Sequence, residues 1–518
     1  KDGTLSQNGT GKFSDIDSET LDYIKWLGCS HVWYTGVIRH STQAVEHGCM
    51  QSHPQFVKGK AGSPYAICDY YDVNPYLADN PADRMSEFEQ LIKRTHDAGL
   101  KMIIDFVPNH VSRDYGKVGM SKGHPVLGAD DDRSIHWKDD NDFYYYVGEA
   151  LTLPTESPKG MKPYEEFPAM ATGNNCFTPS PGINDWYETV KLNYGVDYVG
   201  GRVNHFDPIP DTWNKMLHIL LFWAGKKVDA FRCDMAEMVP VDFWHWAIPQ
   251  VKEQYPHVIF IAEVYNPAEY RNYLHYGHFD YLYDKVGLYD TLKYISQGHQ
   301  NPGAVTGCWQ SINDIQNNML NFLENHDEQR IASDFNLGNP FKAIPSLAVS
   351  LMFNKAPFML YFGQETGETG MLQEGFSGRD GRTSIFDYCS APSVVRMLTG
   401  KMLPSESELL EVYKEMLGFA SSHKAITCGE TYDLQYANIN NPNLDTDKCF
   451  VFARRYSANK GEESFHRGGN QLHQTGSQEK NELVIVVADF SQSCTTAKVT
   501  LPEEFFRYWQ IPYGQLNP

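Results

Sequence analysis

The sequence lacks several features that mark other protein classes. Its ten cysteines are spread over 518 residues without a CxxC pair or a zinc-like spacing, so they indicate neither a metal ribbon nor a dense disulfide scaffold. It contains no run of 18 or more apolar residues. No GxGxxG or GKS/GKT loop follows a strand-like segment. We therefore expect neither a transmembrane segment nor a nucleotide-binding α/β domain.

Basic residues are scarce relative to acidic ones. The chain has 44 Lys and Arg against 65 Asp and Glu, which gives a formal net charge of −21. This balance argues against nucleic acid or an anionic membrane surface as the main partner, and neutral or cationic partners fit better. The polar opening KDGTLSQNGTGKF is not typical of a signal peptide. The oligomeric state stays open.

Short apolar, β-rich runs alternate with longer amphipathic segments over much of the chain. This alternation is typical of repeated βα units around a parallel sheet. The expected strands are 31–37, 101–107, 228–234, 258–264, 279–284, 318–324 and 356–362. The expected helices are 18–28, 84–99, 211–225, 242–254, 287–296 and 341–353. A closed (β/α)8 TIM barrel needs eight strands, so we expect its first strand upstream of residue 1.

Two regions break this alternation. Residues 111–200 are rich in Gly, Pro, Asp and Tyr and are too long for a plain βα loop, which predicts an inserted subdomain or lid. From residue 423 to 518, short strands with polar turns predict a C-terminal antiparallel β-sandwich. The catalytic barrel is then expected in two parts, 1–110 and 201–422.

Polar residues gather where the predicted strands end. In a parallel barrel the reactive groups lie at the C-terminal ends of the strands, because the following loops form the active face. A lone Asp or His at such a place is usually solvated or structural, but acids at four strand ends favour a site. The polar residues at the four strand ends are Asp105, Asn109, His110, Arg232, Asp234, Glu263, His326 and Asp327.

Two of these acids suit glycosidic bond cleavage. Arg232 and Asp234 are two residues apart in one strand and therefore point to the same face. A neighbouring Arg keeps a carboxylate ionised, as a nucleophile requires. Glu263 ends the next strand and suits a general acid. Two carboxylates about 5 to 5.5 Å apart are the geometry of a retaining glycosidase.

Four ordered segments resemble the sequence regions of the α-amylase family, glycoside hydrolase family 13. They are DFVPNH (105–110), DAFRCD (229–234), AEV (262–264) and ENHDEQR (324–330). The likeness runs over nearly the whole chain, including a domain B inserted after strand three and a β-sandwich domain C. It implies a retaining hydrolase of α-1,4-glucosidic bonds in starch or maltodextrins.

The resemblance also implies roles for individual residues. Asp234 would be the nucleophile, Glu263 the general acid and base, and Asp327 the residue that stabilises the transition state. Glu237 and Met238 stand where many members have Lys-His, so we expect the +1 and +2 subsites to differ. The substrate-binding residues implied are Tyr65, Asp69, His110, Arg232 and His326.

The chemistry implied needs no cofactor, but the resemblance allows a structural calcium ion. Asn109 matches a position that binds calcium in many members, and no further ligand can be aligned in the inserted domain. The expected partner is an α-glucan oligo- or polysaccharide. Because such substrates are often polymeric, we expect a secreted, periplasmic or cell-surface enzyme.

Two alternatives stay open. A transglycosylase or α-glucosidase of the same family uses the same three acids and differs in how well water competes with a sugar acceptor. A non-catalytic glucan-binding relative would have lost one or more acids, whereas Asp234, Glu263 and Asp327 are all present.

Overall fold

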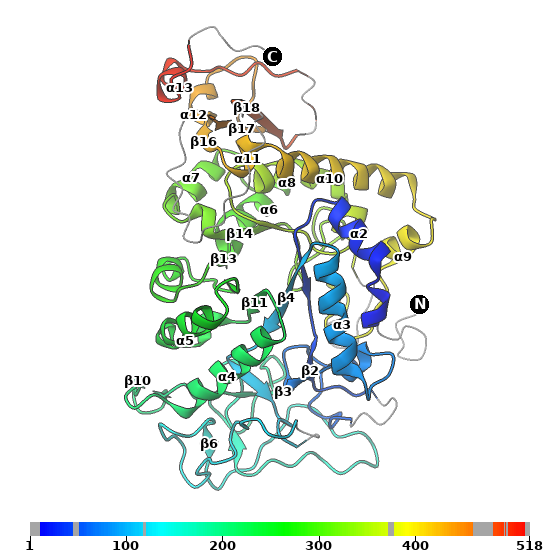
Figure 1. Ribbon diagram of the computed structural model, residues 1–518, viewed down its shortest axis with the longest axis vertical. Coiled ribbons are helices and arrows are strands. Elements are labelled where there is room, and N and C mark those ends of the chain that lie inside the picture. Colours follow the sequence, from blue (N-terminus) through cyan, green and yellow to red (C-terminus); the bar gives the residue numbers. More distant parts are fainter. Residues whose placement is uncertain are drawn as a thin grey trace. The chain divides into compact units, whose positions relative to one another are not determined.

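A computed structural model describes residues 11–44, 51–117, 121–370, 378–458, 480–491, 493 and 496–512 (Figure 1). The chain divides into two compact units. The first comprises Lys1–Tyr283, His326–Arg330 and Glu368–Gly400, and the second comprises Asp284–Asn325, Ile331–Gly367 and Lys401–Pro518. Among the helices of the described ranges, none is long and apolar enough to cross a bilayer.

A parallel sheet forms the centre of the first unit. Its strands lie in the order β1, β4, β11, β12, β13, and each neighbouring pair is parallel. Their bounds are β1 (His31–Tyr34), β4 (Lys101–Phe106), β11 (Ala230–Cys233), β12 (Ile259–Ala262) and β13 (Tyr281–Tyr283). These five strands confirm the five predictions made for this part of the chain.

The second unit contains the last two predicted strands. β14 (Met319–Phe322) and β15 (Phe358–Met359) pair in parallel. The α/β class with parallel strands is therefore confirmed, and the closed eight-stranded barrel stays a prediction.

The predicted helices are present in both units. In the first, they are α2 (Ser18–Trp26), α3 (Arg84–Asp97), α4 (Asp211–Gly225) and α5 (Val241–Gln254), and in the second, α6 (Asp290–Ser296) and α8 (Ile344–Met352). α6 and α8 begin later than predicted because a π-helical turn, η5 (Lys285–Tyr289), and a 3-10 turn, η7 (Pro340–Ala343), precede them. The Asp17 carboxylate begins α2 by accepting the Thr20 N–H at 2.9 Å.

The sheet of the first unit has two chemically different faces. Phe106, Phe231 and Phe260 lie on one face of β4, β11 and β12. The ring centroids of Phe106 and Phe231 are 6.3 Å apart, and those of Phe231 and Phe260 are 5.6 Å apart. The Trp244 ring of α5 lies 6.2 Å from Phe106, so helix α5 covers this face. Figure 1 shows α4 and α5 beside one another, and Trp213 of α4 lies 5.7 Å from Phe243 of α5. The alternate residues of the same strands point the other way.

Residues 107–210 lie between β4 and α4, and their described part (107–117 and 121–210) has short antiparallel strand pairs as its strands. These are β5 (His110–Ser112) with β8 (Thr189–Lys191), β6 (Tyr145–Tyr146) with β7 (Ala169–Met170), and β9 (Val196–Asp197) with β10 (Val203–Asn204). A buried ion pair joins Arg113 to Glu166 at 2.7 Å, and Arg113 also donates to Thr172 at 2.7 Å. The segment thus has a polar core of its own. Its limits as a domain stay a prediction.

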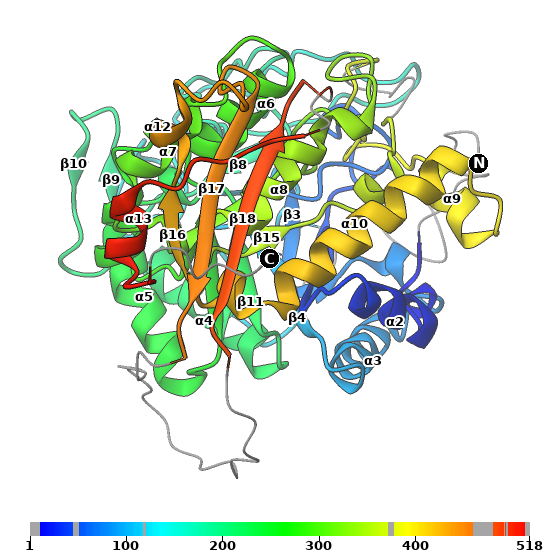
Figure 2. The same cartoon turned by 90° about the horizontal axis from the view of Figure 1, so that it is seen from above.

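The C-terminal part of the second unit carries a three-stranded antiparallel sheet. Figure 2 shows β16 (Glu430–Asp433), β17 (Cys449–Tyr456) and β18 (Glu482–Asp489) side by side. Leu434, Val451, Phe505 and Trp509 share its buried core, the last two at the end of the chain around α13 (Glu503–Tyr508). Among the described residues from 423 to 512, no second sheet packs on this one, so the β-sandwich stays a prediction.

Further elements belong to both units. β2 (Ile38–His40) and β3 (Ile67–Val73) form an antiparallel pair in the first unit. The remaining helices are α7 (Ala304–Ser311), α9 (Pro392–Leu398), α10 (Pro404–Ser422), α11 (Lys424–Thr427) and α12 (Gln435–Asn438).

Candidate active site

Arg232 connects three of the predicted acids in the first unit. Its Nη1 atom lies 2.8 Å from Asp234 Oδ1 and 3.3 Å from Asp105 Oδ1, and its Nη2 atom lies 2.8 Å from Glu263 Oε2. All four side chains are buried. The structure therefore brings together acids from the ends of three neighbouring strands around a single guanidinium.

Strand register explains this meeting. Arg232 of β11 stands opposite Asp105 of β4, and β12 pairs with β11 on its other side. Asp234 follows Arg232 by two residues, so the two share the face opposite to Phe231 and Cys233. The predicted common orientation of Arg232 and Asp234 is confirmed by their contact.

Aromatic rings enclose the guanidinium. Its carbon lies 5.3 Å from the Trp33 ring, 5.4 Å from Tyr65 and 5.5 Å from Tyr283, and its Nε donates to the Tyr283 hydroxyl at 3.1 Å. Trp33 Nε1 also donates to Asp105 at 2.9 Å. Cation–π contacts of this kind stabilise a charge removed from water. Sequence reasoning missed Trp33 and Tyr283, although both lie in predicted strands.

Burial raises the pKa of two of these acids, Asp105 and Asp234. It raises the pKa of Asp105 to about 6 against the opposing effect of Arg232. It likewise raises the pKa of Asp234 well above its usual range, and again the Arg232 guanidinium acts in the opposite direction. The Arg232 guanidinium thus opposes the effect of burial on both Asp105 and Asp234.

The two oxygens of Glu263 have different partners. Oε2 accepts the Met235 backbone N–H at 2.8 Å as well as contacting Arg232. Oε1 accepts the Tyr265 hydroxyl at 2.6 Å. Met235, which directly follows Asp234, has a φ of 43°, a left-handed conformation that is uncommon for a side chain of this size. The turn after β11 is therefore shaped to place an N–H on Glu263.

Tyr65, His326 and Asp327 form a second group beside Arg232. The Tyr65 hydroxyl lies 2.6 Å from His326 Nε2, and the two rings are stacked with centroids 5.5 Å apart. His326 Nε2 lies 3.2 Å from Asp327 Oδ2. The Asp327 side chain is 41% exposed, so a ligand can reach it. Burial, with Arg232 nearby, lowers the pKa of His326 to about 3, which leaves the ring neutral.

His110 and Asp69 have partners in the insertion. The buried His110 ring lies 5.3 Å from Trp186, and burial lowers its pKa to about 3. The Asp69 carboxylate accepts the N–H and the hydroxyl of Ser121 at 2.7 and 2.8 Å. Among the described residues, no hydrogen bond joins Asp69 to Arg232 or to the acids around it. Within the described ranges, Asp69 is thus hydrogen-bonded to Ser121 and not to the acids around Arg232.

The surroundings of Asn109 do not fit a calcium ion. Its Oδ1 accepts a hydrogen bond from the buried amino group of Lys191, which also donates to the Met238 carbonyl at 3.1 Å and whose pKa burial lowers to about 7. Its Nδ2 donates to the Gly173 carbonyl at 2.8 Å. Calcium takes six to eight oxygen ligands, and here the expected ligand oxygen already accepts from the Lys191 amine. Within the described ranges, no group of three or more His, Cys, Asp or Glu could hold a metal ion.

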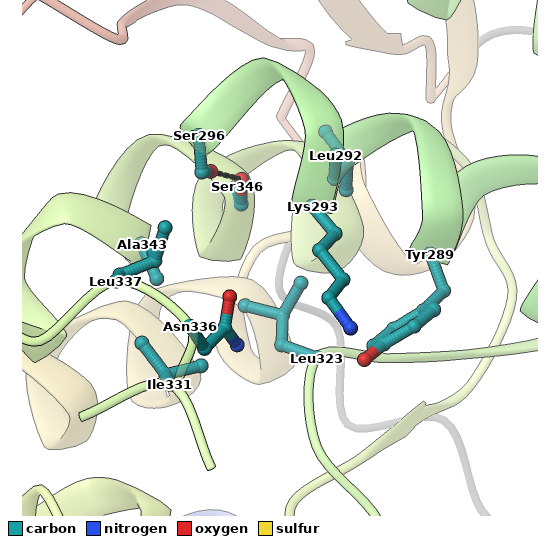
Figure 3. A pocket seen from close by; sticks show the side chains of 10 residues that line it. All are labelled: Tyr289, Leu292, Lys293, Ser296, Leu323, Ile331, Asn336, Leu337, Ala343 and Ser346. Atoms are coloured by element: carbon teal, nitrogen blue, oxygen red, sulfur yellow. Dashed lines mark hydrogen bonds between the residues drawn. The ribbon is translucent and has the colours of Figure 1, made fainter. Parts of the chain in front are cut away.

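A pocket in the second unit lacks acids. Figure 3 shows its lining side chains, among which Ser296 and Ser346 are hydrogen-bonded at 2.8 Å. The lining residues are Tyr289, Leu292, Lys293, Ser296, Leu323, Ile331, Asn336, Leu337, Ala343 and Ser346. None of them is an Asp, Glu or His, so this pocket offers no carboxylate nucleophile or general acid.

Comparison with known proteins identifies the family of this chain. Residues 4–391 match the family model "Alpha amylase, catalytic domain". Alpha-amylase 3 of Dictyoglomus thermophilum is 24% identical over 446 residues, which cover 80% of this chain and 73% of that protein. An α-1,4-glucan:maltose-1-phosphate maltosyltransferase of Cereibacter sphaeroides is 24% identical over 259 residues, 49% of this chain and 30% of that protein.

A solved structure shares the fold. The noncanonic maltogenic alpha-amylase AmyB from Thermotoga neapolitana matches with a TM-score of 0.56 and 17% identity, covering 93% of this chain and 84% of that one. The family model spans well over half of the 518 residues. The chain therefore belongs to the α-amylase family of glycoside hydrolases.

Proposed function

We propose that this protein is a retaining glycoside hydrolase that cleaves α-1,4-glucosidic bonds of starch or maltodextrins. The observation that carries the proposal is the contact of one guanidinium with both Asp234 and Glu263, each at 2.8 Å. It keeps two carboxyl groups together at the end of neighbouring strands, as double displacement requires. The mechanism needs no cofactor.

In the first step, Asp234 is the nucleophile. A lone pair of its carboxylate forms a bond to the anomeric carbon while the bond to the leaving sugar oxygen breaks. That oxygen takes the electron pair and receives a proton from Glu263. The product is a covalent β-glycosyl ester of Asp234. Arg232 contacts Asp234 and favours its ionised form before the attack.

In the second step, Glu263 acts as a base. It removes a proton from water, whose oxygen attacks the anomeric carbon, and the ester bond breaks with its electron pair returning to Asp234. Two inversions leave the α configuration of the substrate in the product. Asp327, which is partly exposed beside His326, would bind sugar hydroxyls as positive charge develops on the ring.

Neutral side chains would bind the sugar in the −1 subsite. Tyr65 would stack on the ring, and His110 and His326 would hydrogen-bond its hydroxyls as neutral imidazoles. Asp69 would close the subsite, held in place by its hydrogen bonds to Ser121 and not by Arg232.

The test is product analysis with the purified protein. Starch, pullulan, maltotriose and sucrose are digested in parallel, and the first anomer formed is followed by NMR. We expect reducing sugars from starch and maltotriose with the α anomer appearing first. An initial β anomer would exclude double displacement, and no sugar release from any substrate would exclude a hydrolase.

Transglycosylation is the second candidate. It is favoured by the similarity to the Cereibacter sphaeroides maltosyltransferase and by Glu237 and Met238, where many family members have Lys-His. Both activities share the covalent intermediate and differ in the acceptor. Longer oligosaccharides formed from maltotriose, at the expense of glucose and maltose, would identify a transferase.

A further inference from the structure

The division of hydrogen bonds between the two Glu263 oxygens identifies a residue outside the predicted site. We propose that Tyr265 is a positioning residue that directs Glu263 Oε1 towards the glycosidic oxygen, and that Glu237 anchors the loop that carries it. This inference rests on the proposed function, because it concerns the group that would serve as general acid and base. It goes beyond the three acids implied by the family resemblance.

Oε1 is the oxygen available to substrate. Oε2 is engaged twice, by the Met235 N–H at 2.8 Å and by Arg232 at 2.8 Å, so it is turned into the protein. A cation and a backbone donor both disfavour a proton on Oε2. The transferable proton therefore belongs on Oε1, which accepts a hydrogen bond from the Tyr265 hydroxyl at 2.6 Å.

Tyr265 is suited to this contact by its place in the chain. It follows Glu263 by two residues just after β12, and its hydroxyl reaches back to Oε1 of that carboxyl group. Burial, together with the neighbouring Glu263 and Asp327, raises the pKa of Tyr265 far above its usual value. The hydroxyl therefore keeps its proton and donates to the carboxylate at any working pH.

Glu237 gives this loop a fixed support. Its Oε2 accepts the backbone N–H of Asn266, the residue after Tyr265, at 3.1 Å. Glu237 lies in the short η3 turn (Ala236–Met238), immediately after Met235. The loop after β11 thus holds Oε2 through Met235, the loop after β12 holds Oε1 through Tyr265, and Glu237 connects the two loops.

The arrangement has a chemical consequence for both steps. With Glu263 ionised, the Tyr265 hydroxyl donates to Oε1 and fixes the direction from which the carboxylate takes a proton from water. With Glu263 protonated, the hydroxyl still donates to a lone pair of Oε1, and the Oε1 proton faces the leaving oxygen. A side chain that merely lined the cleft would affect binding of every substrate equally.

The test compares two leaving groups in the Tyr265→Phe variant. Cleavage of a maltooligosaccharide needs a proton on the leaving sugar oxygen, whereas α-maltosyl fluoride releases fluoride without one. We expect kcat/KM, which reports the first step, to fall by about tenfold to a hundredfold on the oligosaccharide. On the fluoride we expect a change of less than about threefold. Equal losses on both substrates, or no loss on either, would overturn the inference.

Three variants make the outcome specific. Tyr276→Phe is the matched control, because Tyr276 is exposed and donates to a carboxylate, Asp242, at 3.1 Å outside the site. We expect it to match the wild type on both substrates. Glu263→Gln should show the same preference for the fluoride in a stronger form. Glu237→Gln should show it in a weaker form, and an unchanged ratio would overturn the anchoring role of Glu237.

The same measurements separate this inference from the proposed function. A wild-type protein that cleaves neither substrate would overturn both. A wild type active on both substrates, with Glu263→Gln selectively impaired on the oligosaccharide and Tyr265→Phe impaired equally on both, would retain the proposed function and overturn only the role of Tyr265. Melting temperatures near that of the wild type would establish that each variant is folded.

Discussion

Nη1 of Arg232 lies 2.8 Å from Oδ1 of Asp234, with both side chains buried. Burial alone raises the pKa of the Asp234 carboxyl, and the guanidinium opposes that rise. The pair thus combines a low-solvent environment, in which a carboxylate is a stronger nucleophile, with a fixed cation that permits ionisation. The acid limb of the pH profile, where activity falls as the pH is lowered, should therefore depend on both burial and the guanidinium.

Replacing Arg232 by Gln should therefore shift the acid limb. Loss of the cation raises the pKa of Asp234 further, so a higher pH is needed to ionise it. We expect the acid limb of kcat/KM to move to higher pH by about one unit or more, with lower activity throughout. Lys at this position keeps one charge but not the forked contact, and should give a smaller shift. An acid limb that stays in place in Arg232→Gln would contradict the pairing.

Replacing Glu263 by Gln should abolish most turnover without unfolding the protein. The amide keeps the shape of the carboxylate but cannot deliver or accept the proton, which is worth about two to four orders of magnitude. Starch hydrolysis and circular dichroism would be measured together. Glu253→Gln, at an exposed position of α5, is the control and should retain wild-type rates. A near-normal rate for Glu263→Gln would remove it as the acid.

His326 should contribute to binding rather than to pH dependence. Its pKa of about 3 leaves the ring neutral over the working range, and a group with a lowered pKa takes up its proton only in strongly acidic solution. We expect His326→Asn to lower kcat/KM by about tenfold, the value of a lost hydrogen bond to substrate. The shape of the profile between about pH 5 and pH 8 should match that of the wild type. Loss of either limb would show that the ring titrates during catalysis.

Lys191 should stabilise the folded protein at the place where the family resemblance allowed a calcium ion, beside Asn109. In Lys191→Met, the Asn109 and Met238 oxygens lose their buried donor. We expect the free energy of unfolding to fall by about 1 to 3 kcal/mol, measured by urea denaturation. Lys401→Met, at an exposed position, should have no effect. A chelator such as EDTA should leave the wild-type melting temperature unchanged, and a rise on adding calcium would contradict the fit at Asn109.

The sequence predicted the strands and the acids at their ends because one local rule governs both. Alternating residues place Arg232 and Asp234 on one face and Phe231 on the other, and parallel strands bring their C-terminal ends together. Trp33 and Tyr283 could not be distinguished from core residues, since an aromatic side chain in a strand is usually buried packing. Only their spatial neighbour, Arg232, gives them a different role.

Contacts made by the insertion were beyond sequence reasoning. Residues 107–210 have little regular structure, so no periodicity predicts which side chains turn inward. The sequence therefore did not indicate that Lys191 hydrogen-bonds Asn109 or that Ser121 hydrogen-bonds Asp69. The resemblance to α-amylases supplied Asp69 and Asn109 but not their partners in this chain.

The two-faced sheet has a consequence for how such a protein can diverge. In β11, a single inserted or deleted residue would turn Arg232 towards α5 and Phe231 towards the acids, so the core and the active site would fail together. Substitutions there can be tolerated one at a time, but changes in length cannot. Length variation is restricted to segments such as 107–210, which lie outside the sheet. We expect related proteins to differ in substrate range mainly through that segment, while the spacing from Arg232 to Asp234 stays fixed.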